Sequence, residues 1–236
     1  MKLPQEYLHG ILIKRYKRFL VDVKLDDDVI MTAHTANTGA MLGCAEPGMQ
    51  VWLYDRYNPK RKYRYSWELV ADKENNFVGI HSHHANKLVE EAIHEKKIKD
   101  LQDYQSISAE VKYLNTNSRF DFLLSGNNGK PDCYLEVKNV TAKRNNSTAI
   151  FPDAVSTRGQ KHLQHLMDAK SKGYRAAIIY CIQRNDVDYF SAAQEIDSDY
   201  AKLVTKAKDA GVEIIATKCV VNPQEIYISE PVKLLW

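Results

Sequence analysis

Cysteine is sparse in this chain, and no two cysteines lie close together in the sequence. Four are present among 236 residues, and no Cys-x-x-C motif occurs. A zinc knuckle and a dithiol redox motif are therefore not indicated. Cys133 and Cys181 lie in apolar, strand-like runs, and we expect buried, reduced thiols at both positions.

The sequence also lacks a long hydrophobic run and a strong excess of either charge. No segment approaches the length of a membrane-spanning helix, and residues 1–6 contain no apolar signal core. We therefore expect a cytoplasmic protein with no membrane partner. Basic residues number 33 and acidic residues 30, which gives a net charge of +3. Such a small excess does not indicate nucleic acid by itself, so the placement of the basic side chains has to be considered.

Residues 1–80 are predicted to form a small β-domain. Short apolar or alternating runs predict strands at residues 10–13, 19–25, 29–34, 50–54 and 66–70. Several short strands in a segment of this length are typical of an OB-like β-barrel. A separate small sheet or an SH3-like barrel fits the same pattern.

Two clusters in this β-domain mix basic and aromatic side chains. Residues 55–65 contain five basic residues against one acidic residue, with tyrosines between them, and residues 14–18 repeat the mixture. Basic groups neutralise phosphates and phenol rings stack on bases, so the two clusters together predict nucleic-acid binding. A solvated basic loop is the alternative for either cluster alone. The predicted DNA-binding residues here are Lys14, Arg15, Lys17, Arg18, Arg56, Tyr57, Lys60, Arg61, Lys62, Tyr63 and Arg64.

Residues 81–236 are predicted to form a mixed α/β domain. An amphipathic helix is expected from about Asn86, and strands follow at residues 106–113, 118–124 and 134–139. A helix at about 157–172, a buried strand at 175–182, a helix ending at Gly211 and strands at 212–216 and 225–228 complete the pattern. This order, αβββαβαβ, is typical of a restriction-endonuclease-like core.

The hairpin of residues 118–124 and 134–139 carries the most informative side chains. Strand alternation places Asp121 on the polar face of the first strand, and Glu136 and Lys138 on the polar face of the second. The apolar faces are expected to carry Phe120, Phe122, Leu124, Leu135 and Val137. Two carboxylates can hold a hard cation such as Mg²⁺ or Mn²⁺, and an adjacent lysine can orient water or stabilise phosphate charge. We therefore predict Asp121, Glu136 and Lys138 as catalytic residues, with a salt-bridged solvent face as the alternative.

Two other acidic positions bear on this prediction. Asp132 follows a proline but lies four residues before Glu136, roughly 13 Å along the strand, so Asp121 is the better partner. The helix beginning near Asn86 offers a third carboxylate at Glu90 or Glu91, and helical geometry does not choose between them. The predicted metal ligands are Asp121, Glu136 and Glu91, with a solvated acidic helix face as the alternative for Glu91.

Polar residues beside two of the predicted helices complete the candidate site. Arg158 and Gln160 lie on the first turns of the helix at 157–172 and are predicted to face phosphate, although a solvated polar face gives the same pattern. His81, His83 and His84 precede the first helix. We expect them to form a polar loop, because no further metal ligand is evident nearby in the sequence.

Taken together, these stretches resemble the sugar fermentation stimulation protein A family of bacteria and archaea. The matching segments are residues 37–39, 41, 43–44, 58–62, 110–113, 119–124, 136–141, 151–155 and 158–162. The resemblance implies an N-terminal OB-like domain, a C-terminal PD-(D/E)XK-like domain, DNA binding, and a regulatory role in sugar metabolism, notably that of maltose. By position it also implies a nuclease-like site at Asp121, Glu136 and Lys138. It gives no role to His81, His83 and His84.

Three functions remain open from the sequence. The first is a regulatory DNA-binding protein that uses the nuclease-like core as a platform, which the family description favours. The second is an endonuclease or exonuclease dependent on Mg²⁺ or Mn²⁺, which the complete set of Asp121, Glu136 and Lys138 favours. An RNA-binding module that relies mainly on the barrel is the third.

Overall fold

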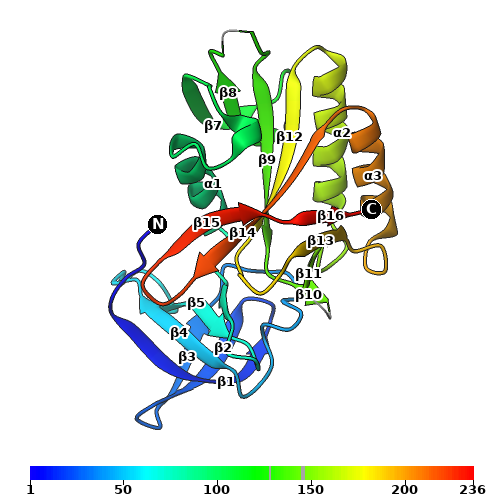
Figure 1. Ribbon diagram of the computed structural model, residues 1–236. Helices are drawn as coiled ribbons and strands as arrows, with labels where there is room; N and C mark the ends of the chain where they lie inside the picture. Colours follow the sequence, from blue (N-terminus) through cyan, green and yellow to red (C-terminus); the bar gives the residue numbers. More distant parts are fainter. Residues whose placement is uncertain (128, 145–146) are drawn as a thin grey trace.

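The first six strands of the chain form one mainly antiparallel sheet that closes on itself (Figure 1). They are β1 (Tyr7–Tyr16), β2 (Leu20–Leu25), β3 (Ile30–His34), β4 (Gln50–Asp55), β5 (Tyr65–Ala71) and β6 (Phe77–Gly79). A pairing of β3 with β5 closes β1 to β5 into a barrel. The computed structural model describes residues 1–127, 129–144 and 147–236. It confirms the predicted strands of the barrel and adds β6, which is too short to show a pattern.

Strand β5 lies where the barrel meets the rest of the chain. Its residues Trp67 and Val70 belong to the barrel core, whereas Leu69 packs into the core that lies beneath α1 (His84–His94). Every residue from Ser66 to Ala71 is buried, and Glu68 among them is only 2% exposed. A buried carboxylate needs polar partners, and Glu68 accepts a hydrogen bond from the guanidinium of Arg56.

A second six-stranded sheet forms the centre of the remaining chain, in the order β15-β14-β12-β9-β8-β7. Its strands are β7 (Ser106–Lys112), β8 (Arg119–Ser125), β9 (Cys133–Val140), β12 (Arg175–Ile182), β14 (Glu213–Val221) and β15 (Ile226–Pro231). Strands β9, β12 and β14 run parallel, and the other pairings are antiparallel. All four cysteines are free and buried, as predicted for Cys133 and Cys181.

Helices cover both faces of this sheet (Figure 1). Helix α1 packs on β9, β12 and β15 on one face, and α2 (Thr157–Ser171) packs on β9 and β12 on the other, beside α3 (Ser198–Asp209). A short 3₁₀ helix, η1 (Lys99–Leu101), follows α1. The predicted helices are confirmed, although α1 begins two residues before Asn86. Within the described residues, no helix is long and apolar enough to cross a membrane.

A small four-stranded sheet beside the central one is absent from the predicted pattern. It comprises β10 (Lys143–Arg144), β11 (Thr148–Phe151), β13 (Tyr189–Ala192) and β16 (Lys233–Leu235), in the order β10-β11-β13-β16. Strands of two to four residues are too short to show an alternating pattern. The sheet matters for the site because β11 ends at the start of the loop that leads into α2.

The predicted face of Phe120 on β8 is wrong. Phe122 and Leu124 pack into the core beneath α1, whereas the ring of Phe120 lies 5.2 Å from that of Tyr134 in the core beneath α2. The pairing of β7 with β8 skips Asp121 and its opposite residue Glu110, which has a φ angle of 53°. This irregularity turns β8 between Phe120 and Phe122, and Asp121 lies at the turning point.

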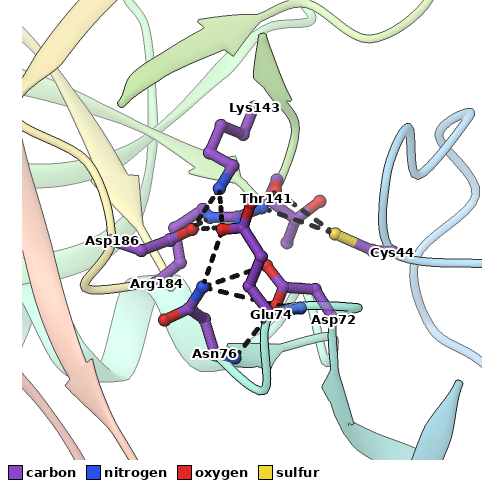
Figure 2. Close-up of polar contacts among 8 residues, drawn as sticks. All are labelled: Cys44, Asp72, Glu74, Asn76, Thr141, Lys143, Arg184 and Asp186. Carbon is purple, nitrogen blue, oxygen red and sulfur yellow. Dashed lines mark hydrogen bonds and ion pairs between the residues drawn. The ribbon is translucent and has the colours of Figure 1, made fainter. Parts of the chain in front are cut away.

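Arg184, just after β12, joins the barrel to the α/β region (Figure 2). Its side chain is only 1% exposed and donates hydrogen bonds to Asp72 (2.9 Å), Asp186 (2.6 Å) and the carbonyl oxygen of Thr141 (3.0 Å). Lys143 donates a further hydrogen bond of 2.5 Å to Asp186. Asp72 and Asp186 are therefore paired with the cations Arg184 and Lys143.

The first residues of the chain form a second attachment between the two regions. The backbone N–H of Leu3 donates to the carbonyl oxygen of Gln224 (2.9 Å), and that of Ile226 donates to the carbonyl oxygen of Met1 (3.0 Å). Leu3 is buried in the core beneath α1. The chain therefore begins against β15, forms the barrel, and returns to the α/β region at α1.

Candidate functional site

The carboxylate of Asp121 is fixed between β8, β9 and α1. Pairing of β8 with β9 ends at Phe122 and Leu135, and the strands separate beyond that point. One oxygen of Asp121, Oδ2, accepts a hydrogen bond of 2.7 Å from the backbone N–H of Val137. The other, Oδ1, accepts one of 2.8 Å from the side-chain amide of Asn86. Both oxygens are thus oriented by donors from neighbouring elements.

Glu136 lies beside this carboxylate, under α2. Its Oε1 atom accepts a hydrogen bond of 2.6 Å from Nζ of Lys138 and is also in contact with Nδ1 of His162. Its Oε2 atom is buried and has no hydrogen-bond partner among the described residues. An unsatisfied buried oxygen of this kind costs about 1–3 kcal/mol or more. A cation or a water molecule bound to Oε2 of Glu136 would supply the missing partner.

The two carboxylates have opposite pKa shifts. Burial raises the pKa of Asp121, and the negative charge of Glu136 raises it further. Burial also opposes ionisation of Glu136, but the charge of Lys138 and the hydrogen bond with His162 outweigh it and hold the pKa below its ordinary value. Repulsion between the two carboxylates would be relieved by a shared cation. The residues present therefore fit a hard divalent metal.

The predicted contribution of Glu91 to a metal site is not supported by its position. Its Oε2 atom forms an ion pair of 2.6 Å with the N-terminal amine of Met1. Asn86 marks the side of α1 that faces Asp121, and at ~100° per residue Glu91 lies roughly 140° away from it around the helix. Glu90 lies only roughly 40° from Asn86. The helical pattern alone did not show which side of α1 faces the site.

A cleft of about 700 Å³ lies between the barrel and the α/β region, with Lys138 in its wall. Its basic lining comes from both regions, with Arg15 and Arg18 on the barrel side and Lys138 and Arg158 on the other. Asp153 is the acidic residue in this lining. The cleft is therefore electropositive overall, and Lys138 in its wall bonds to Glu136 of the carboxylate pair.

Several segments that carry the family resemblance meet at this cleft although they are far apart in the sequence. Residues 37–39 of the barrel lie against residues 151–155, and both segments line the cleft. The backbone N–H of Met41 donates to Oδ2 of Asp153 (2.9 Å). A side chain at position 39 would collide with the same carboxylate, which explains the glycine there. The cleft is thus assembled from the most recognisable parts of the sequence.

In the first basic cluster, the structure separates binding candidates from structural residues. The guanidinium of Arg15 donates to the backbone oxygens of Asn37 (3.1 Å) and Gly39 (2.8 Å), so it holds the loop at the cleft entrance. Lys14 forms an ion pair of 3.5 Å with Asp22. Lys17 and Arg18 are exposed, and Arg18 lines the cleft. Arg18 is therefore the strongest phosphate-binding candidate of this cluster.

The second cluster is also partly structural. Arg56 donates to Ser66 (2.9 Å) and to Glu68, Arg61 donates to Ser66 (3.2 Å), and Arg64 donates to Asp55 (2.6 Å). The hydroxyl of Tyr57 donates to Glu6 (3.0 Å). Lys60 and Lys62 are exposed and have no ion-pair partner within the part of the chain that the structure describes. Nζ of Lys62 lies 5.6 Å from the ring of Tyr63. Arg61 is half-buried and bonds only to the neutral hydroxyl of Ser66, so the exposed charges of this loop without an ion pair among the described residues are those of Lys60 and Lys62.

The two residues predicted on α2 have different positions. Arg158 lines the cleft, as phosphate binding would require. Gln160 instead donates to both carboxylate oxygens of Asp197, at 2.9 and 3.1 Å. Asp197 caps the N-terminus of α3. Its carboxylate accepts hydrogen bonds, and the side-chain amide of Gln160 is one of the donors. We therefore assign Gln160 a structural role.

Neither Asn86 nor His162 was predicted from the sequence to contact the carboxylate pair, although His162 lies on the early turns of α2 that were considered for phosphate binding. Asn86 lies beside the apolar stripe of α1, where an amide resembles any other polar surface residue. His162 follows Arg158 by one helical turn and precedes the buried Leu163. Its position at the edge of the apolar face of the helix could have indicated a buried histidine. Its partner, Glu136, is shown only by the packing of α2 on β9.

Comparison with known proteins gives a consistent result over the whole chain. The model of the SfsA N-terminal OB domain matches residues 13–80, and that of the sugar fermentation stimulation protein RE domain matches residues 83–225. These matches confirm the family resemblance, and the barrel together with the mixed α/β region confirms the predicted fold class.

Curated relatives and a solved structure agree with these matches. A sugar fermentation stimulation protein homolog of Pseudoalteromonas atlantica is 44% identical over 235 residues, covering 100% of both chains. A homolog of Hahella chejuensis is 47% identical over 234 residues, covering 99% of this chain and 97% of the relative. The structure of Pyrococcus furiosus SfsA in complex with Ca²⁺ has a TM-score of 0.88 and 24% identity, covering 100% of this chain and 98% of that chain.

Proposed function

This chain belongs to the sugar fermentation stimulation protein family, and we propose that it is a DNA-binding protein that holds the phosphate backbone in the cleft between its two regions. One observation carries the proposal. Arg18 of the barrel and Arg158 and Lys138 of the α/β region line a single cleft of about 700 Å³. Basic groups on both walls can neutralise consecutive phosphates of one strand.

Each of the two regions predicted from the sequence has its own role in this function. Residues 1–80 supply an OB-like surface for nucleic acid, and residues 81–236 supply a PD-(D/E)XK-like core that receives the backbone at Lys138. OB barrels bind nucleic acid through basic grooves and aromatic platforms. In the cell, we infer a regulatory role linked to sugar metabolism, in keeping with the family.

Fluorescence anisotropy with labelled duplex and single-stranded DNA, titrated at several salt concentrations, tests this proposal. Replacing Arg18 and Arg158 by alanine should weaken binding across sequences. It should also lower the log–log salt slope by about 0.7–0.9 for each lost phosphate contact. Arg144→Ala is the matched control, because Arg144 is exposed, pairs with Glu195 and does not line the cleft. An unchanged slope in the folded double variant would remove the cleft from the interface, and tighter binding to RNA would redirect the proposal to RNA.

A second candidate, metal-dependent cleavage of phosphodiester bonds, is favoured by the orphan Oε2 atom of Glu136 beside Asp121. Asp121 and Glu136 would hold Mg²⁺ or Mn²⁺, and the Ca²⁺ complex of the Pyrococcus furiosus relative supports a hard cation. Such an ion supplies Lewis-acid stabilisation of the phosphate and a more acidic water. Lys138 would position the attacking water or the scissile phosphate, and His162 would keep Glu136 in place.

Incubation of the purified protein with supercoiled, linear and single-stranded DNA, with and without Mg²⁺ or Mn²⁺, tests this second candidate. Lys138→Ala should abolish metal-dependent cleavage, while its effect on binding should be limited to the one phosphate contact that Lys138 supplies in the cleft. In parallel, divalent metal should raise the melting temperature of the wild type, because it binds the folded state. The Asp121→Asn, Glu136→Gln double variant should lose that shift. Cleavage that survives Lys138→Ala, or a wild type without cleavage and without a shift, would leave DNA binding as the function.

A further inference from the structure

We propose that Glu68, His81 and His84 form a second metal site, suited to a transition metal such as Zn²⁺, Co²⁺ or Ni²⁺, where the barrel meets α1. One ligand atom from each of the three side chains lies within 4.8 Å of the others. Glu68 comes from β5, His81 lies between β6 and α1, and His84 is the first residue of α1. The site is separate from the carboxylate pair of Asp121 and Glu136, and it does not depend on the proposed function.

The buried polar atoms of this cluster lack partners. Nδ1 of His81 and Nδ1 of His84 are buried and have no hydrogen-bond partner among the described residues. The hydroxyl of Tyr7 is also buried and has no hydrogen-bond partner among the described residues, and burial and the nearby charge of Glu68 raise its pKa. Each such atom is destabilising as long as it has no partner. His84 presents Nε2 to Glu68, so a cation bound there would leave its Nδ1 for a separate partner, and Nδ1 of His81, without a partner in the described part of the chain, is the ring nitrogen that a cation could bind.

The chemistry of the ligands selects the kind of metal. Two imidazoles and one carboxylate are a common set for zinc and for similar ions, whereas Mg²⁺ and Ca²⁺ prefer oxygen ligands only. Oε2 of Glu68 lies 3.6 Å from Nε2 of His84. Ligand atoms bound to one tetrahedral metal lie roughly 3.3 Å apart. This pair already has nearly the required separation. The imidazoles of His81 and His84 are stacked with their centroids 4.4 Å apart, so one ring has to rotate for both to bind one metal, because an imidazole lone pair lies in the ring plane.

Arg56 competes with a metal for the same carboxylate. Its guanidinium bonds to Oε1 of Glu68 and leaves Oε2, which faces His84, for a cation. The positive charge of Arg56 opposes cation binding at close range. Removing this charge should therefore strengthen binding at this site and have no such effect at a site elsewhere in the protein.

Titration of the full chain with Co²⁺, followed by visible absorbance, and with Zn²⁺, followed by calorimetry, tests the proposal. We expect one equivalent of metal bound with four-coordinate Co²⁺ bands. His81→Ala and His84→Ala should each weaken binding by more than about 100-fold, which exceeds the usual effect of a residue behind the ligands. His83→Ala is the matched control, because His83 is an exposed neighbour outside the cluster. The Asp121→Asn, Glu136→Gln variant should bind as the wild type does, and Arg56→Met should bind about tenfold more tightly.

Three results would overturn the proposal. They are the absence of binding by the wild type, unchanged binding in His81→Ala and His84→Ala, and loss of binding in His83→Ala. If the alanine variants do not fold, the imidazole ¹⁵N chemical shifts of the wild type with and without Zn²⁺ decide the question. Large shifts confined to His81 and His84 would support the site, and shifts at other histidines alone would exclude it.

Discussion

The side-chain amide of Asn86 donates a hydrogen bond of 2.8 Å to Oδ1 of Asp121. Through this bond the first turn of α1 orients a carboxylate of β8. The backbone N–H of Val137 holds the other oxygen at 2.7 Å, so three elements determine the direction of Asp121. The geometry of the candidate metal site therefore depends on how α1 docks on the sheet.

Substitution of Asn86 tests this dependence. Asn86→Ala should lower the free energy of unfolding by about 1.5–3 kcal/mol, because a hydrogen bond to the half-buried carboxylate of Asp121 is lost. Asn86→Asp should be destabilising without metal, through repulsion of like charges, and should show a larger rise in melting temperature with Mg²⁺ or Mn²⁺ than the wild type. Urea denaturation and thermal melts measure both effects. Lys87→Ala, at the next and exposed position, is the control, and equal behaviour of Asn86→Ala and Lys87→Ala would contradict the role of Asn86.

Loss of Arg184 should destabilise the whole chain. Arg184→Leu leaves the buried carboxylates of Asp72 and Asp186 without their guanidinium partner. Breaking a buried pair of this kind typically costs about 3–5 kcal/mol. Urea denaturation provides the measurement, and Lys73→Ala provides the comparison, since Lys73 forms an exposed ion pair with Glu46. The comparison variant should change stability by less than about 1 kcal/mol. A similar small effect of Arg184→Leu would show that the network is dispensable.

Asp186 should make stability depend on pH in the acidic range. Burial opposes its ionisation, but Arg184 and Lys143 outweigh this and hold the pKa below the ordinary value of 3.8. The unfolded chain therefore binds a proton at this carboxylate more readily than the folded chain does. The contribution of Asp186 is complete above its ordinary pKa and is lost as the pH falls through the lower folded pKa.

Melting temperatures measured from neutral pH down to about pH 3 test this linkage. Below about pH 4 the wild type should lose stability more steeply than Asp186→Asn, in which the titrating group is absent. From pH 5 to 7 the difference between the two proteins should stay constant. Parallel curves over the whole range would mean that Asp186 titrates as it does in the unfolded chain.

The loop of residues 55–65 should bind DNA through its lysines rather than its arginines. Replacing Lys60 and Lys62 by alanine should lower the log–log salt slope of duplex binding by about 0.9 per contact while leaving the melting temperature unchanged. Replacing Arg61 and Arg64 should instead lower the melting temperature, because these side chains bond to Ser66 and Asp55. Anisotropy and thermal melts on both double variants separate the two roles. The reverse result would assign phosphate binding to the arginines.

Much of the fold follows from local patterns. Strand β12 is a continuous apolar run, α2 begins after the capping residue Ser156, and the barrel strands alternate. The small sheet of β10, β11, β13 and β16 was missed because its strands are too short to have a pattern. The opposite facing of Phe120 and Phe122 depends on an irregularity in β7, a different strand. Local sequence cannot report a rotation that a neighbouring strand imposes.

For the site, residue types were easier to predict than partners. The hairpin pattern brought Asp121, Glu136 and Lys138 together because adjacent strands have a fixed spacing. The neutralisation of Glu91 by Met1 and the pairing of Gln160 with Asp197 depend on contacts between distant segments. Glu68 shows the same limit, since a glutamate inside an apolar strand gives no sign that His81 and His84 fold back onto it. Such contacts join segments that are far apart in the sequence, so only the folded structure shows them.

The two attachments of the barrel have a mechanical consequence for the cleft. Residues 1–3 bind to β15, the barrel returns directly into α1, and Arg184 bonds across the contact to Asp72. Because the barrel is connected to the α/β region at residues 1–3, at α1 and through Arg184, we do not expect it to rotate about a single hinge. We therefore expect the cleft between the barrel and the central sheet to keep a nearly constant width. In the proposed complex, the DNA strand would then have to bend or unstack to fit, because the cleft would not open around it.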